Sequence, residues 1–223
     1  MKTIHLLPLF VVLIGVVGLC GCRSSSTTGS NDPVKVTADF AAEAKSDFPL
    51  QEEYADDDYG FQFRYPENWE IMKKIMGAQV IAREIPVGDV TFVQNANVVV
   101  TPADPDLPNI KKNKMIQMIQ KRYANINVTN FEIGEFLGKK AIRLRFEGTM
   151  KNETNPVAPT IPLVLTQYFS NHDDKLFVIT FSNSLENEAK NPKAREIEAA
   201  ILASFRFPET TKQEDQQEKA ETP

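Results

Sequence analysis

Strict alternation of apolar and charged residues is the feature that most constrains the fold of this chain. It is clearest over residues 141–147. Because successive side chains of a β-strand point to opposite faces of the sheet, this pattern predicts a strand with one face in the core and one in solvent. We expect Ile142, Leu144 and Phe146 to point inward, and Arg143, Arg145 and Glu147 to point outward.

Several other segments have the length and composition of strands. The polar stretch 170–174 separates two of them, so we expect a hairpin with the only histidine beyond the first 21 residues, His172, in its exposed turn. A catalytic role for His172 is disfavoured on this ground. The predicted strands cover residues 60–65, 79–84, 92–101, 161–169 and 176–181.

Two amphipathic helices are predicted between and after these strands. Residues 111–124 form one, with an apolar face that ends at Tyr123. The other starts with Asn191 as N-cap and Pro192 in the first helical position, and its apolar stripe continues to Phe205. Helices of this kind cover sheet faces, so the predicted fold class is α+β: an α-β-α sandwich with a largely antiparallel sheet covered by amphipathic helices.

The first residues have the layout of a secretory signal that ends at a lipidation site. Lys2 precedes an apolar run of about fifteen residues, which is shorter than the roughly 20 that a membrane-spanning helix needs. Leu19-Cys20-Gly21-Cys22 resembles a bacterial lipobox, with an aliphatic residue at −3 and a small one at −1 relative to Cys22. We therefore predict a signal peptide over residues 1–21 and a lipid on Cys22. Cys20 is the weaker candidate because bulky Leu19 would precede it.

Cysteine and histidine usage excludes several kinds of site. With Cys20 removed and Cys22 acylated, no disulfide can form, and only His172 is left for a histidine-dependent site. Cys/His metal clusters and Cys–His nucleophile pairs are excluded. A net charge of −5 lacks the excess of positive charge that is typical of nucleic-acid binding.

Composition also divides the chain into segments. Residues 22–53 begin with a Ser/Thr-rich stretch and are predicted to be a flexible, lipid-anchored tether, although Thr37 could cap a short helix that reaches Ala44. Residues 54–207 form one domain, and the charged residues 208–223 form a disordered tail.

Four stretches of the domain carry a resemblance to a known family. The order of a Gly-Phe-aromatic-Pro-x-x-Trp opening, a mid-chain helix, long hairpins and a last helix ending in Ser-Phe resembles the PsbP-like family, which includes DcrB-like bacterial lipoproteins. The resemblance implies an α-β-α sandwich that binds rather than catalyses. The matching stretches are residues 59–69, 97–102, 137–141 and 201–205.

Two acidic stretches and one proline-rich stretch are the remaining candidates. Asp56-Asp57-Asp58 lacks the spaced ligands of a calcium loop and is interpreted as a solvated run. Asp104 and Asp106, among prolines, are interpreted as a rigid connection. Residues 152–162 contain three prolines and are the nominated partner surface, because exposed loops often carry recognition.

The expected function follows from these observations. We predict a membrane-anchored bacterial lipoprotein that acts as a non-catalytic interaction or assembly module of the cell envelope, with no cofactor, no nucleic-acid partner and an envelope protein as partner. The membrane contact is the covalent lipid on Cys22. The alternative is a lipoprotein that binds a small ligand or a metal ion. Arg23 follows Cys22 where an aspartate would retain the protein at the inner membrane, so the cell membrane and the outer membrane both remain as locations, the latter favoured in a two-membrane cell.

Overall fold

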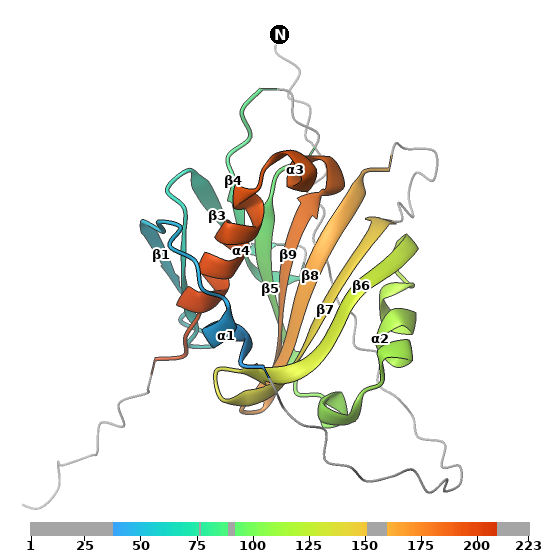
Figure 1. Ribbon diagram of the computed structural model, residues 1–223. Coiled ribbons are helices and arrows are strands. Elements are labelled where there is room, and N and C mark those ends of the chain that lie inside the picture. Colours follow the sequence, from blue (N-terminus) through green and yellow to red (C-terminus); the bar gives the residue numbers. More distant parts are fainter. Residues whose placement is uncertain (1–37, 76, 89–91, 151–159, 209–223) are drawn as a thin grey trace, which may run out of the picture.

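The computed structural model describes residues 38–75, 77–88, 92–150 and 160–208 (Figure 1). Their centre is a seven-stranded sheet in which all neighbouring strands are antiparallel. The strand order is β3-β4-β5-β9-β8-β7-β6, so the chain meanders from one edge and returns from the other. The strands are β3 Trp69–Ile75, β4 Ala78–Glu84, β5 Asn95–Pro102, β6 Tyr123–Phe136, β7 Lys139–Met150, β8 Pro162–His172 and β9 Lys175–Ser184.

Short helices and a small hairpin pack on this sheet. On the face turned to the viewer in Figure 1 lie α1 Phe40–Glu43 and α4 Lys193–Ser204. The hairpin of β1 Glu52–Ala55 and β2 Gln62–Tyr65 joins the same apolar cluster. The 3-10 helix η1 Leu107–Asn109 and α2 Lys112–Ile119 belong to the cluster on the other face, and α3 Leu185–Lys190 connects β9 to α4. The fold is therefore α+β, as predicted, and the antiparallel sheet dominates it.

The strand predictions are confirmed at each position, with shifted ends. The inward residues of β7, among them Leu144 and Phe146, are fully buried under the α2 side of the sheet. Both faces of β8 and β9 are buried, because a cluster of apolar residues lies on each side. The two central strands are thus surrounded by core.

The C-terminal helix is fastened to β2 by aromatic stacking. The Phe205 ring, directly after α4, stacks on Phe61 with centroids 5.3 Å apart and on Phe63 at 5.9 Å. Next to this stack the Arg64 amide donates to the Ser204 hydroxyl at 2.8 Å. The apolar stripe predicted for this helix is therefore the surface that closes the core.

The helix predicted over residues 111–124 extends five residues too far at its C-terminal end. It ends at Ile119, and Tyr123 instead begins β6, where it pairs with Met150. Its ring is 2% exposed and lies edge-on to Phe146, with centroids 5.1 Å apart. An aromatic residue that looked like part of a helical stripe is buried just as well by the strand, and pairing with β7 decides between the two.

The tether predicted over residues 22–53 is wrong for its second half. Asp39 caps α1 by accepting from the amides of Ala41 and Ala42, and the Phe40 side chain is 0% exposed. Burying a phenylalanine contributes about 1.5–3 kcal/mol, which is enough to hold so short a helix in place. The amide of Glu135 on β6 also donates to the carbonyl of Ala38 at 2.7 Å. The folded domain therefore begins by residue 38; Thr37 lies outside the described residues.

Candidate functional site

The outward side of β7 does not face solvent. Arg143, Arg145 and Glu147 lie on the face that carries α1 and α4, and the side chains of Arg143 and Arg145 are only 22% and 18% exposed. The prediction that these arginines point into water is wrong, because carboxylates of α1, α3 and α4 lie against their guanidiniums. Two guanidiniums are thus held close to a core, where each needs a partner.

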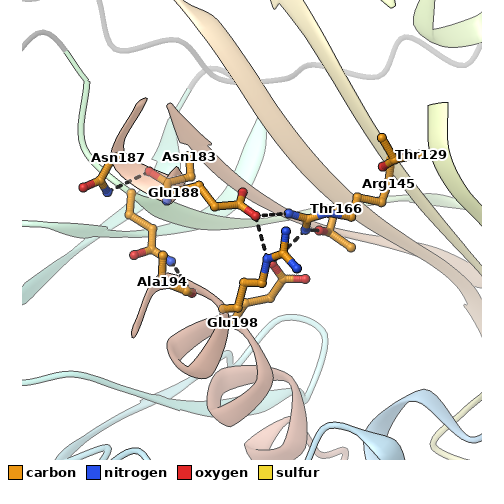
Figure 2. Close-up of polar contacts among 10 residues, drawn as sticks. Thr129, Arg145, Thr166, Asn183, Asn187, Glu188, Ala194 and Glu198 are labelled. Carbon is orange, nitrogen blue, oxygen red and sulfur yellow. Dashed lines mark hydrogen bonds and ion pairs between the residues drawn. The ribbon is translucent and has the colours of Figure 1, made fainter. Parts of the chain in front are cut away.

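Arg145 is the centre of an ion-pair network that joins the sheet to two helices (Figure 2). Its guanidinium donates to the Thr166 hydroxyl on β8 at 2.6 Å and to the Glu188 carboxylate on α3. Glu198 on α4 lies 3.7 Å from Arg145 Nη1, the nitrogen that also donates to Thr166. Arg195, which is 72% exposed, donates from Nε to the same Glu188 oxygen at 2.7 Å. One partly buried arginine therefore connects β7, β8, α3 and α4.

Arg143 makes a second network two residues along β7. Its guanidinium pairs with Glu132 on β6 and lies 3.6 Å from Glu43 on α1. The same group lies over the Phe40 ring, 4.7 Å from its centroid. A hydrogen bond links Arg143 to the Tyr168 hydroxyl, whose pKa is raised above its ordinary value mainly by burial. This end of the site is closed by the helix that follows the N-terminal segment.

Burial also changes the titration of Glu198. Loss of solvent raises the pKa of its carboxyl above the usual range, and the neighbouring Glu188 acts in the same direction. Arg145 and a hydrogen bond from Thr166 oppose this shift without cancelling it. Glu198 therefore protonates more readily than a solvent-exposed glutamate does.

Two hollows lie on either side of Arg145. One, of about 330 Å³, is bordered by Glu43, Arg143 and Tyr168. The other, of about 430 Å³, is bordered by Glu147, Leu185 and Ala189. Asn130, Arg145 and Arg195 line both, so the two hollows adjoin each other, and we call them together the Arg145 groove.

His172 is not in an exposed turn. It is the last residue of β8, and the turn consists of Asp173 and Asp174. Its ring is 26% exposed and stacks on Phe207, with centroids 3.7 Å apart and planes 10° apart. Burial lowers the pKa of His172, and Nδ1 is buried with no hydrogen-bond partner in the described residues. His172 lies six residues from Thr166, roughly 20 Å along the strand, so it is far from the Arg145 groove.

The acidic run is only partly solvated. Asp56 is 5% exposed, and its carboxylate accepts from the Tyr54 hydroxyl at 2.7 Å and Gln79 Nε2 at 2.9 Å. It also accepts from the amides of Asp58 and Tyr59. Four internal donors occupy the oxygens that a cation would need. In the described part of the chain, no three His, Cys, Asp or Glu side chains are grouped to hold a metal ion.

Of the remaining predicted positions, the acidic loop at Asp104 is described, whereas the lipidation site and most of the proline-rich loop are not. Cys22 lies outside the described residues, as do residues 152–159 of the nominated proline-rich loop. Asp104 begins a tight turn, with its carboxylate accepting from the Asp106 amide at 2.9 Å, in agreement with a rigid connection. Among the described residues, no helix combines the length and the apolar character that crossing a bilayer requires.

Sequence reasoning missed the Arg145 groove. The available signal was an Arg-x-Arg pair on a strand for which helices were predicted on both faces of the sheet. Arginines under a helix must be paired, and the predicted last helix offered Glu198 as a partner. The second partner, Glu188, lies on α3, which was not predicted.

Comparison with known proteins finds similarity of structure only. No protein-family model and no curated protein matches the sequence. A cyanobacterial PsbP from Synechocystis sp. PCC 6803 is 14% identical, with a TM-score of 0.48 over 80% of this chain and 98% of that chain. The PsbP-like resemblance expected from the sequence is present in the structure. It is a resemblance of fold.

Two further structures are similar at the same level. LpqN from Mycobacterium tuberculosis, a protein involved in cell envelope biogenesis, is 13% identical with a TM-score of 0.44, over 71% of this chain and 91% of that chain. A point mutant of the protein Mog1 is 10% identical with a TM-score of 0.48, over 71% and 96%. What this chain binds has to be argued from its own residues.

Proposed function

We propose that this chain is a lipid-anchored protein of a bacterial cell envelope that binds a partner at the Arg145 groove and catalyses no reaction. The lipobox before Cys22 supports the anchor. The Arg145 groove supports the binding role, and it is the observation on which the proposal depends. It places charged and apolar side chains side by side along two adjoining hollows.

The chemistry of the groove favours binding over catalysis. Its arginines are each paired with a carboxylate, and such mutual pairing fixes side chains in place. A nucleophile with an adjacent base would be needed for acyl transfer, and His172 lies at the other end of β8. Hydrolysis by two carboxylates would need Glu188 and Glu198 available to a substrate, whereas both form ion pairs with Arg145.

A small-ligand binding lipoprotein is the second candidate. The hollows of about 330 and 430 Å³ have the size of small-molecule sites. Such sites are lined mostly by apolar side chains, however, whereas charged and amide residues border both of these hollows. A polypeptide partner fits this mixed lining better.

The anchor is tested by exchanging each cysteine of the lipobox. Cys22→Ser removes the acyl acceptor, so we expect the protein to leave the membrane fraction. Cys20→Ser is the matched control: it keeps Leu19 and Gly21 in place and should leave the protein on the membrane. A Cys22→Ser protein that stays membrane-bound after a salt wash refutes the lipid anchor.

The binding role is tested by site-specific photocrosslinking in cells. A photoreactive amino acid at Leu185, 40% exposed at the groove, should crosslink to a discrete protein. The same probe at Ile85, 48% exposed beyond the end of β4, is the comparison position. If neither position gives a discrete crosslinked product, the interaction role fails.

A further inference from the structure

The Arg145 groove carries more negative than positive charge. Five carboxylates line it or pair directly with an arginine that lines it, and three guanidiniums oppose them, which leaves an excess of two negative charges. Protonation of Glu198 would still leave an excess of one. Such a groove attracts cations and repels anions. The carboxylates are Glu43, Glu132, Glu147, Glu188 and Glu198, and the guanidiniums are Arg143, Arg145 and Arg195.

Glu147 is the carboxylate of this set that lies on no arginine. Glu132, Glu188 and Glu198 each lie on an arginine, and Glu43 shares Arg143 with Glu132. The Glu147 carboxylate has one hydrogen bond in the described residues, from Asn127 Nδ2 at 3.4 Å, and no ion pair there. It lines the larger hollow on the same side of β7 as Arg145. A cation placed in that hollow would reach a carboxylate that is not already paired.

Apolar and amide groups adjoin Glu147. Leu185 is 40% exposed, and Ala189 and Val164 line the same hollow. Deeper in, Asn183 is 6% exposed, and its Nδ2 is buried with no hydrogen-bond partner in the described residues. Asn183 lines a small hollow that shares Arg145, Val164 and Glu188 with the larger one. That small hollow has a volume of about 10 Å³, which is the space of about one water molecule, so this amide lies behind the groove and not on its surface.

These features define the chemistry of a ligand. A lysine or arginine meets Glu147, and an apolar side chain packs on Leu185. A free small cation would satisfy the first of these and leave the apolar rim bare. An extended peptide supplies both from neighbouring residues.

We propose that the Arg145 groove binds an extended peptide segment of an envelope protein, in which a lysine or arginine next to an apolar residue pairs with Glu147. The inference rests on the proposed interaction role and names the kind of partner. Pairing through one partly exposed carboxylate implies modest affinity that falls with ionic strength.

The test measures binding of short fluorescein-labelled peptides to the full-length chain in non-ionic detergent by fluorescence anisotropy. One peptide has a Leu-Lys-Leu centre in a Gly/Ser background, and the other carries citrulline in place of lysine. We expect the lysine peptide to bind at least about tenfold more tightly, and salt to weaken it. Glu147→Gln should reduce its affinity by about tenfold, whereas Glu67→Gln, an exposed residue in the β2–β3 turn, should leave it unchanged.

Three results would overturn the inference. Equal binding of the two peptides, or full affinity in the Glu147→Gln protein with an unchanged melting temperature, excludes the charge pairing. Binding of spermidine without binding of the lysine peptide identifies a small-cation site instead. Failure here is separable from failure of the proposed function: a crosslink at Ile85 but not at Leu185 keeps an interaction role and moves it away from the groove.

Discussion

Arg145 on β7 and Glu188 on α3 form an ion pair that links α3 to the sheet. The helix has no buried residue of its own, so its position cannot depend on a large apolar surface. The Ser184 hydroxyl caps its start by accepting from the Asn187 amide at 3.0 Å. Beyond that cap, Asn187 donates to Asn183 Oδ1 on β9 at 2.9 Å, and Glu188 pairs with Arg145 on β7 and with Arg195 on α4.

Replacing Glu188 with glutamine should therefore destabilise the protein. The change leaves Arg145, 18% exposed, with Glu198 as its remaining carboxylate, and removes the partner of Arg195. We expect a loss of about 1–3 kcal/mol in the free energy of unfolding, measured by urea denaturation. Glu186→Gln on the same helix breaks a fully exposed pair with Lys190 and should cause no measurable change. Equal effects of the two substitutions would contradict this role of Glu188.

Gly134 on β6 is the point at which residues 38–40 dock on the sheet. A Cβ at this position would lie 2.4 Å from the carbonyl oxygen of Ala38 and 2.8 Å from the Phe40 ring. Gly134→Ala should displace residues 38–40 and destabilise the protein by about 1–3 kcal/mol. Hydrogen exchange of the Glu135 amide, which donates to Ala38, reports this displacement directly.

Gly148→Ala is the matched control for that substitution. Its Cβ would lie 3.2 Å from the carbonyl oxygen of Ala124, a tight contact that a small shift relieves. We expect a smaller loss of stability and unchanged exchange at Glu135. If Gly134→Ala leaves the Glu135 amide as protected as before, the docking of this segment does not depend on close approach.

The His172–Phe207 stack should make stability depend on pH. Burial and the nearby Lys139 lower the pKa of His172 in the folded protein, and Asp173 opposes them only in part. The unfolded chain, with an ordinary histidine pKa of about 6.5, then binds a proton that the folded protein does not. This contribution to stability is complete above pH 6.5 and is lost as the pH falls through that value toward the folded pKa.

His172→Phe removes the titration and keeps a ring against Phe207. We expect wild type and variant to differ little in pH dependence from pH 8 to 7. Between pH 7 and 5.5 the wild type should lose stability that the variant retains, as measured by the urea midpoint at each pH. Parallel curves for the two proteins over that range would show that the His172 pKa is not lowered.

Local pattern and long-range contact explain which predictions succeeded. The strand of residues 141–147 was predicted because its apolar and charged side chains alternate from one residue to the next. Tyr123 was assigned to a helix because its spacing from Ile119 also fits a helical stripe, and only the partner Met150, 27 residues away, decides for the strand. Phe40 was left in a tether because nothing next to it shows that Gly134 leaves room for its ring.

The sequence by itself determined the strands and the α+β class, because each depends on residues that are close together in the chain, and for the same reason it carries the motif on which the proposed lipid anchor at Cys22 rests. Only the tertiary structure decided that Arg143 and Arg145 lie beneath helices, that His172 stacks on Phe207, and that a groove with an unpaired Glu147 results. Alternation fixes which residues share a face of a strand. What covers that face depends on α1, α3 and α4, which come from distant parts of the chain and are positioned by packing.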